Sequence, residues 1–233
     1  MSMKRICALF LKELQDLRRN TSILSMLAVP LLMTFLWSGL LGMPPNQSFT
    51  IGTLFGVIMA GVYSPAMMFA EEKEKHTLRV LMLSPATPGE ILISKGLITF
   101  LMIILVTLLL IPISGVTVLS YPLLAVVLLL GSIFVISLGF LIGLFSPNQM
   151  ATGYIGMPVY LVLLLIPMLG QQNRLLAALA KFVPSNYIGD GVFKALQGQS
   201  LAGAQTELLA LTLSSLITLT IFIVAYRRRE VSE

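Results

Sequence analysis

Long apolar stretches separated by short polar breaks make up most of this chain of 233 residues. A transmembrane helix needs roughly 20 mostly apolar residues, and six stretches reach that length. The uncharged run from Gly96 to Asn173 supplies most of three of them, because polar breaks near Ser120 and at 146–149 divide it. We therefore predict spans near residues 22–41, 50–70, 93–118, 122–145, 150–170 and 207–226.

Residues 1–20 precede the first span and follow a helical period. Charged residues, Glu13 among them, lie mostly off one apolar stripe, which comprises Ile6, Leu9, Phe10, Leu14 and Leu17. A helix with two such faces lies in the membrane interface, so we predict an interfacial anchor in preference to a docking site for a specific partner. No small-x-small cleavage site follows, and we expect no cleavable signal peptide.

The segment 171–206, between the last two spans, is polar only in part. Its apolar residues at helical spacing predict one short helix before Pro184. Ser185 or Asn186 could cap a second helix, which would end near Gly198. Two amphipathic helices of this kind would lie at the edge of the bilayer as a lid over the spans.

Composition agrees with a membrane protein. The chain is 57% hydrophobic and 11% charged, with a mean hydropathy of +0.94, whereas soluble domains carry about 25% charged residues. The expected fold is an all-α integral membrane protein with a single domain over residues 1–233. Cys7 is the one cysteine, so no disulfide can form within the chain.

The placement of lysine and arginine predicts the orientation in the membrane. With six spans and both termini inside, only Arg174, Lys181 and Lys194 of the 15 lysines and arginines fall outside. The positive-inside rule therefore places both termini in the cytoplasm, together with the loop after the second span.

That loop belongs to a dense charged segment at residues 71–95. Because charge is costly in lipid, the segment must lie in water or on a partner. Glu71 stands four residues before Lys75 and Glu72 three before it, and such pairs favour a helix that continues out of the second span. Pro85 would end this helix, since the residue before a proline disfavours the α region.

A second helix is predicted after this break. Thr87 would be its N-cap, Pro88 its first residue, and Glu90 would complete a capping box. The segment thus predicts a helix, a tight turn and a helix. The alternative is a solvated loop, in which the apolar residues at 78–83 would have no use.

The sequence lacks the residues that several function classes require. No Gly-x-x-x-x-Gly-Lys-Ser/Thr loop occurs, so any ATP chemistry belongs to a partner. No ionisable residue lies in the middle of a span, which disfavours an ion-coupled carrier, although a Na⁺ site of backbone carbonyls stays open. His76 is the only histidine, which excludes histidine-based metal clusters and leaves no histidine base for a serine inside the membrane.

Two ladders of small residues allow close helix contact. They are Gly52, Gly56 and Ala60 in the second span, and Gly139 and Gly143 in the fourth. Packing within one chain is the preferred interpretation, and a dimer interface is the alternative.

A family resemblance rests on the charged segment. It reads Glu-Glu-Lys-Glu-Lys-His-Thr-Leu-Arg-Val-Leu-Met-Leu-Ser-Pro at 71–85, then Glu-Ile-Leu at 90–92 and Lys-Gly at 95–96. This resembles the permease subunits of ATP-binding cassette (ABC) exporters, the ABC type-2 permease family, in which an acidic cluster ends the second span and an Ile-Leu-x-x-Lys motif enters the third. His76 stands where the family usually has glycine, and Arg79 where an acid is common. The resemblance extends over the whole chain.

The resemblance implies that residues 71–92 contain a coupling helix seated in a groove of a separate ATP-hydrolysing subunit. The implied contact residues are Glu71, Glu72, Glu74, His76, Thr77, Leu78, Arg79, Leu81, Met82, Ser84 and Pro85, and Thr87 and Glu90 cap the next helix. ATP and Mg²⁺ would be bound by that partner, and this chain would hold no cofactor, metal or catalytic residue. A second copy or a related permease would complete a dimer, and residues 171–206 would match the family's re-entrant helices.

The expected function is therefore that of a permease subunit, without an ATPase site of its own, in an ATP-driven exporter. Its cargo would be amphipathic or lipid-like, such as a drug, a peptide antibiotic or a lipid-linked compound, moved out of the cytoplasm or the inner leaflet. The protein would lie in a bacterial or archaeal cell membrane, in contact with the lipid bilayer. We expect no nucleic acid among its partners. The alternatives are a non-transporting scaffold or sensor subunit and an ion-coupled carrier.

Overall fold

The computed structural model describes residues 2–75, 86–117, 119–170 and 173–230. Within these ranges every regular element is a helix. In chain order the elements are α1 (Met3–Arg19), α2 (Thr21–Phe35), a π-helical segment (Leu36–Leu40), α3 (Pro45–Ile58), a second π-helical segment (Met59–Tyr63), α4 (Ser64–Glu74), α6 (Pro88–Ser114), α7 (Tyr121–Phe145), α8 (Gln149–Leu169), α9 (Arg174–Ala180), α10 (Pro184–Leu196), a 3₁₀ turn (Leu201–Ala204) and α11 (Gln205–Glu230).

Six of these continuous helical stretches are long and apolar enough to cross a membrane, which confirms the all-α membrane fold. They are Thr21–Leu40, Pro45–Glu74, Pro88–Ser114, Tyr121–Phe145, Gln149–Leu169 and Leu201–Arg228. The third stretch ends at Ser114 because Gly115 takes the left-handed conformation, with φ of 72°, and a glycine in this conformation commonly ends a helix.

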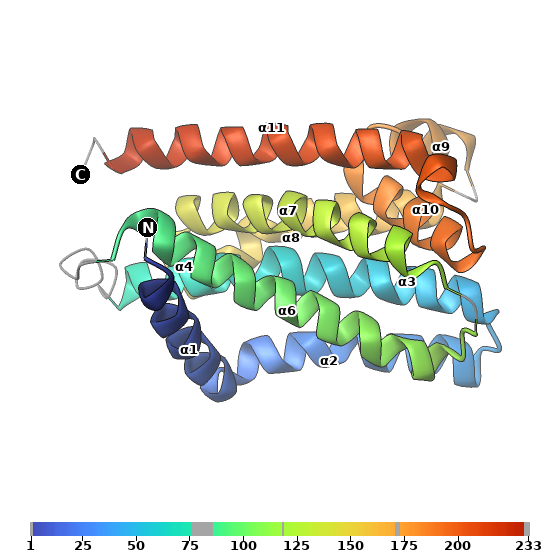
Figure 1. The fold of residues 1–233 in the computed structure, drawn as a ribbon, viewed down its shortest axis with the longest axis horizontal. Helices are drawn as coiled ribbons and strands as arrows, with labels where there is room; N and C mark the ends of the chain where they lie inside the picture. The colour runs from blue at the N-terminus through green and yellow to red at the C-terminus, as the bar shows by residue number, and fades with distance from the viewer. Residues whose placement is uncertain (1, 76–85, 118, 171–172, 231–233) are drawn as a thin grey trace.

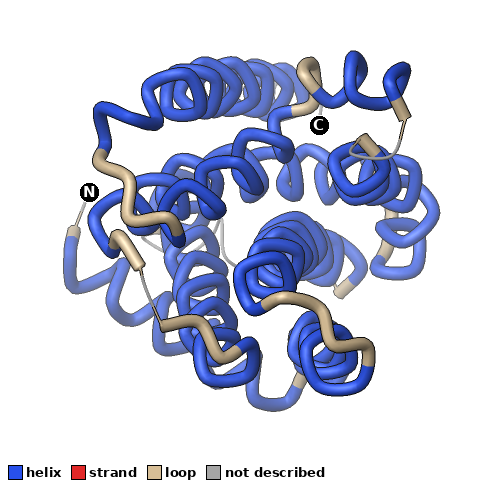
Figure 2. The backbone as a smooth tube through the Cα atoms, turned by 90° about the vertical axis from the view of Figure 1, so that its right-hand side faces the viewer, coloured by secondary structure: helices blue, strands red, loops and turns tan. Residues whose placement is uncertain are grey.

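The long helices run side by side along the molecule (Figure 1), and the end-on view shows them gathered in one bundle (Figure 2). Helix α1 lies obliquely at the end where α4 finishes and α6 begins, whereas α9 and α10 lie at the opposite end. The described chain starts and finishes at the α1 end, as an even number of spans requires.

The second span forms the centre of the bundle. In its most apolar window 83% of the residues are buried inside the protein, against 17% for the first and last spans. Small residues permit this close packing. A Cβ atom on Gly139 would lie 2.5 Å from the carbonyl oxygen of Val62, and one on Gly61 would lie 2.2 Å from a methyl group of Val135. In these contacts the small residues pack helices of one chain against each other.

The π-helical segment Met59–Tyr63 interrupts the second span immediately before Ser64 and Pro65. A proline has no N–H to donate, and its ring collides with the carbonyl one turn earlier in an α-helix. A π turn is wider by one residue and is a common place for such an interruption. The proline is thereby accommodated in the middle of the bundle.

The two helices between the last two spans differ in part from the prediction. Helix α10 begins at Pro184 with Val183 at the N-cap, so neither Ser185 nor Asn186 caps it. The Ser185 hydroxyl instead donates to the carbonyl of Leu163 at 2.6 Å, and Asn186 donates to Asp190 at 2.8 Å. Proline is favoured at the first helical position, where its missing N–H costs nothing.

Helix α10 packs into the bundle against α3, α7, α8 and α11. Its residues Ile188, Val192 and Ala195 are fully buried. Leu175 of α9 and Phe182 after it are exposed instead. Helix α10 thus belongs largely to the core, although Phe193 is exposed, whereas α9 and the residue Phe182 present apolar side chains outward.

Candidate functional site

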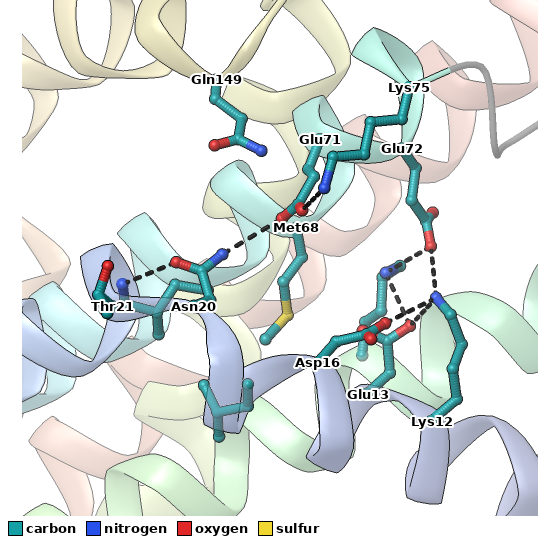
Figure 3. A pocket seen from close by; sticks show the side chains of 13 residues that line it. Lys12, Glu13, Asp16, Asn20, Thr21, Met68, Glu71, Glu72, Lys75 and Gln149 are labelled. Carbon is teal, nitrogen blue, oxygen red and sulfur yellow. Dashed lines mark hydrogen bonds and ion pairs between the residues drawn. The ribbon is translucent and has the colours of Figure 1, made fainter.

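Three elements converge at the end of the molecule where the charged segment begins: α1, the last turn of α4 and the first turns of α6. Lys95 of α6 is 1% exposed, and its Nζ lies 2.9 Å from Glu13 Oε1 of α1 and 2.8 Å from Glu72 Oε1 of α4. Lys12 Nζ lies 3.2 Å and 3.3 Å from the same two oxygens. We call these four residues the ion cluster; Figure 3 shows Lys12, Glu13 and Glu72 pointing toward one another.

Glu13 reaches the ion cluster because it belongs to the buried face of α1. Phe10, Leu14 and Leu17 pack partly buried against the core, and Glu13 lies among them at 4% exposure. The expectation that Glu13 lies off the apolar stripe was therefore wrong. An acidic residue can lie within the apolar stripe of a helix when a cation on the neighbouring helix forms an ion pair with it.

The charges of the ion cluster compensate one another. Burying an unpaired charge costs several kcal/mol even after relaxation, and two neighbouring carboxylates also repel each other. Here two lysines face two glutamates, so the net charge is zero. The charged segment was expected to lie in water or on a partner, yet Glu72 and Lys95 lie inside this chain.

The pKa of Lys12 reflects this arrangement. Burial by itself would lower it, but the carboxylates of Glu13, Glu72 and Asp16 together raise the pKa above the ordinary lysine value. Lys12 is therefore charged at neutral pH. Because the pKa in the folded state is the higher one, this stabilisation is fully present at neutral pH and is lost only in strongly alkaline solution.

A second polar contact joins α1 to the start of α6. Thr87 is the N-cap of α6; its hydroxyl accepts from the N–H of Glu90 at 3.3 Å, and its own N–H donates to Glu90 Oε2 at 2.9 Å. The other carboxylate oxygen accepts from the N–H of Ser2, the N-cap of α1, at 2.6 Å, and Arg5 lies 3.6 Å from the carboxylate. Glu90 thus accepts hydrogen bonds from backbone N–H groups at the N-terminal ends of two helices.

The last turn of α4 is held from two further directions. Glu71 forms an ion pair with Lys75, as expected from their spacing, and its other oxygen accepts from Asn20 Nδ2 at 3.2 Å. Lys73 donates to the carbonyl of Leu144 at 2.9 Å, at the C-terminal end of α7. Cations are favourable at helix C-termini because the last carbonyls lack partners.

Glu74 completes this set of contacts. It accepts from the N–H of Gln149, the first residue of α8, at 3.0 Å. The four residues Glu71 to Glu74 therefore reach α1, α6, α7, α8 and the junction between α1 and α2. A displacement of this turn would act on most of the bundle at this end.

A pocket of about 830 Å³ opens beside the ion cluster. Its lining combines charged residues of α1 and α4 with apolar ones: Lys12, Glu13, Asp16, Leu17, Asn20, Thr21, Ile23, Met68, Glu71, Glu72, Lys75, Lys95 and Gln149. Gln149 faces the pocket from the side opposite Asn20 and Thr21 (Figure 3). Among the residues that the structure describes, no group of three His, Cys, Asp or Glu is arranged to hold a metal ion.

The structure places five residues of the predicted site. Glu71, Glu72 and Glu74 lie in the last turn of α4, and Thr87 and Glu90 form the capping box. Glu72 pairs with Lys95 and Lys12, whereas its spacing had predicted Lys75. The remaining residues, His76, Thr77, Leu78, Arg79, Leu81, Met82, Ser84 and Pro85, lie outside the described residues.

Sequence reasoning missed Lys12, Glu13 and Lys95 as site residues. Two signals were available: an acidic residue between the apolar positions of α1, and a lysine two turns inside α6, after which the helix carries no further charge. A lone charge of either kind needs a partner of opposite sign nearby. The spacing along the chain could not identify that partner, because the two are 82 residues apart.

Comparison with protein-family models matches residues 45–226, well over half of the chain, to the family described as ABC-2 family transporter protein. No curated protein matches the chain.

Proposed function

Since the chain belongs to the ABC-2 family of transporter proteins, it is a multi-pass permease subunit, and we propose that it serves an ATP-driven exporter by receiving work from a separate ATPase subunit at residues 71–92. ATP and Mg²⁺ would bind to that partner, because the sequence has no phosphate-binding loop. The expected contact residues of the segment would form the interface with that subunit.

One observation carries the proposal: the last turn of α4, at the start of the segment, is tied by polar contacts to the helices around it. Glu72 contacts α1 and α6, Lys73 the end of α7, and Glu74 the start of α8. A push on this turn would therefore move several spans as a body, which is the kind of motion that alternating access requires.

We propose that both termini lie in the cytoplasm of a bacterial or archaeal cell, on the same side as the ATPase subunit. The described chain starts and finishes at the α4–α6 end, and the positive charge of the sequence favours that end as the inner one. The path would form with a second copy or a related permease. The cargo would be amphipathic or lipid-like, in keeping with the apolar spans.

The proposal is tested with Leu78, in the apolar part of the segment. The full-length protein would be purified in mild detergent from its own host, with any ATPase subunit that accompanies it. We expect ATPase activity to co-purify, and we expect Leu78→Ser to reduce that activity about tenfold, since one buried apolar side chain contributes about 1.5–3 kcal/mol. Leu175→Ser, at an exposed leucine of the opposite end, is the matched control.

Transport is measured in vesicles that contain the same complex, with a fluorescent amphiphile as the probe. ATP should drive its accumulation, and Leu78→Ser should abolish it while Leu175→Ser retains it. Accumulation driven by an ion gradient without ATP would contradict the proposal and favour the carrier. Co-purified ATPase activity that is identical in the two variants would contradict the role of residues 71–92.

A further inference from the structure

We infer that Lys95 is a positioning residue that makes α1 move together with the last turn of α4. A single ammonium group holds one carboxylate from each of these elements, at 2.9 Å from Glu13 and 2.8 Å from Glu72. This inference rests on the proposed function, in which α4 is the element that receives work. It adds α1 as a second moving part of the transport cycle.

The connection between α1 and α4 depends on charged and polar groups. Lys12 bridges the same two carboxylates from the side of α1, and Asn20, at the end of α1, donates to Glu71. The apolar face of α1 packs mainly on α6. Lys95 projects from α6 at this point, so the cluster joins three elements at one site.

A buried ion pair transmits displacement better than an apolar contact does. Apolar contacts are not directional and allow one surface to slide over another. Separating Lys95 from either carboxylate would leave a buried charge without its partner, which is strongly unfavourable. The distance between Glu13 and Glu72 therefore stays fixed while α4 moves.

The position of α1 gives this connection a consequence. Helix α1 lies obliquely across the bundle end and continues through Asn20 directly into α2, the first span (Figure 1). Its N-terminal end is held to α6 through Ser2 and Glu90 at 2.6 Å. A displacement of α4 would thus reach the first span through α1, and the third span both through α1 and directly through Lys95.

The chain offers a matched control at its other end. Lys194 of α10 pairs with Glu207 of α11 at 2.8 Å, also partly buried. It joins two helices in the same way, but it lies far from the segment that would contact the ATPase subunit. Lys194→Met removes one partly buried, ion-paired lysine without touching the ion cluster.

Four variants of the full complex test the inference: Lys95→Met, Lys95→Arg, Glu13→Gln and Lys194→Met. The measured quantity is the amount of fluorescent amphiphile transported per ATP hydrolysed. We expect about a tenfold fall in Lys95→Met and Glu13→Gln, within the usual range of coupling between two sites. Lys95→Arg keeps a cation with several donors and should stay within about twofold of the unmodified protein, as should Lys194→Met.

The single cysteine supplies a readout of movement that a merely structural role would not change. Cys7 lies on α1 and is exposed. In the unmodified complex, its rate of reaction with a thiol reagent should differ between the nucleotide-free state and a state trapped with a non-hydrolysable ATP analogue. In Glu13→Gln, which preserves the side chain's shape, that difference should disappear. Lys194→Met should retain it.

The outcomes separate the two proposals. If the unmodified complex shows no ATP-dependent transport, the proposed function fails. If it transports but Lys95→Met, Glu13→Gln and Lys194→Met behave alike, or if Cys7 reacts at the same rate in both nucleotide states, the role of Lys95 is overturned. Should Lys95→Met not assemble, Glu13→Gln and Lys95→Arg decide the question by themselves.

Discussion

Individual side chains at the α1 end hold more than one element each. The Glu90 carboxylate accepts N–H groups from the starts of both α1 and α6, and Lys95 serves carboxylates from α1 and α4. Because a helix N-terminus carries unsatisfied N–H groups and partial positive charge, one carboxylate can stabilise two such ends when they meet. Each such residue therefore fixes relative positions as well as local structure.

At the residue scale, the capping box predicts the effect of a change at Thr87. Thr87→Ala should lower the free energy of unfolding by about 1 kcal/mol, because the N–H of Glu90 loses its acceptor. Thr87→Ser should restore stability, since serine caps as well. Thermal unfolding of the purified protein in detergent measures both, and equal stability of the alanine and serine variants would contradict the role of the hydroxyl.

At the scale of elements, small residues allow α7 to pack very closely against the second span. The π-helical segment Met59–Tyr63 carries Gly61, which faces α7, while Gly139 of α7 faces it in return. Each helix thus contributes a glycine at the crossing. Small residues at such points bring backbones together, and in a bilayer this packing is a main source of helix association.

Gly139→Ala is predicted to damage this crossing. The new Cβ would lie 2.5 Å from the carbonyl oxygen of Val62 and 2.6 Å from the ring of Pro65. Overpacking of this kind costs about 1–3 kcal/mol, so the thermal midpoint should fall. Gly153→Ala in α8 is the control, because it meets nothing within 4 Å and should be neutral or slightly stabilising. Equal midpoints for the two variants would show that the crossing is not tight.

At the scale of the whole molecule, the fold sorts its parts between two ends. The ion cluster, the capping box and the end of α4 lie at one end, and α9 and α10 at the other. The bundle between them is uncharged in its middle. Any signal from one end to the other must therefore travel as movement of packed helices, since charges do not extend along the spans.

This arrangement predicts which ends of the protein are reachable from outside the cell. An impermeant maleimide should label Cys7 only after the membrane is opened, because α1 belongs to the end that we place in the cytoplasm. In a Cys7→Ser background, Arg174→Cys, at the start of exposed α9, should be labelled in intact cells. Labelling of Cys7 in intact cells would contradict this orientation and indicate the opposite one.

The sequence by itself determined the features that depend on local periodicity. Six apolar stretches of sufficient length predicted six spanning helices, and Thr87, Pro88 and Glu90 predicted a helix start that the structure contains. Such features follow from a few neighbouring residues, whose spacing decides whether a backbone group or an apolar face finds its partner. The charged segment begins at the end of the molecule where the ion cluster lies.

Only the tertiary structure decided where the charges of that segment lie. Glu72 and Lys95 were expected in water or on a partner, but α1 supplies Glu13 and Lys12, and all four meet inside one chain. Similarly, Ser185 or Asn186 was expected to cap α10, and Ser185 contacts α8 instead. The reason is common to both: the energy of a buried polar group depends on the partner that folding brings to it, and that partner comes from a distant part of the chain.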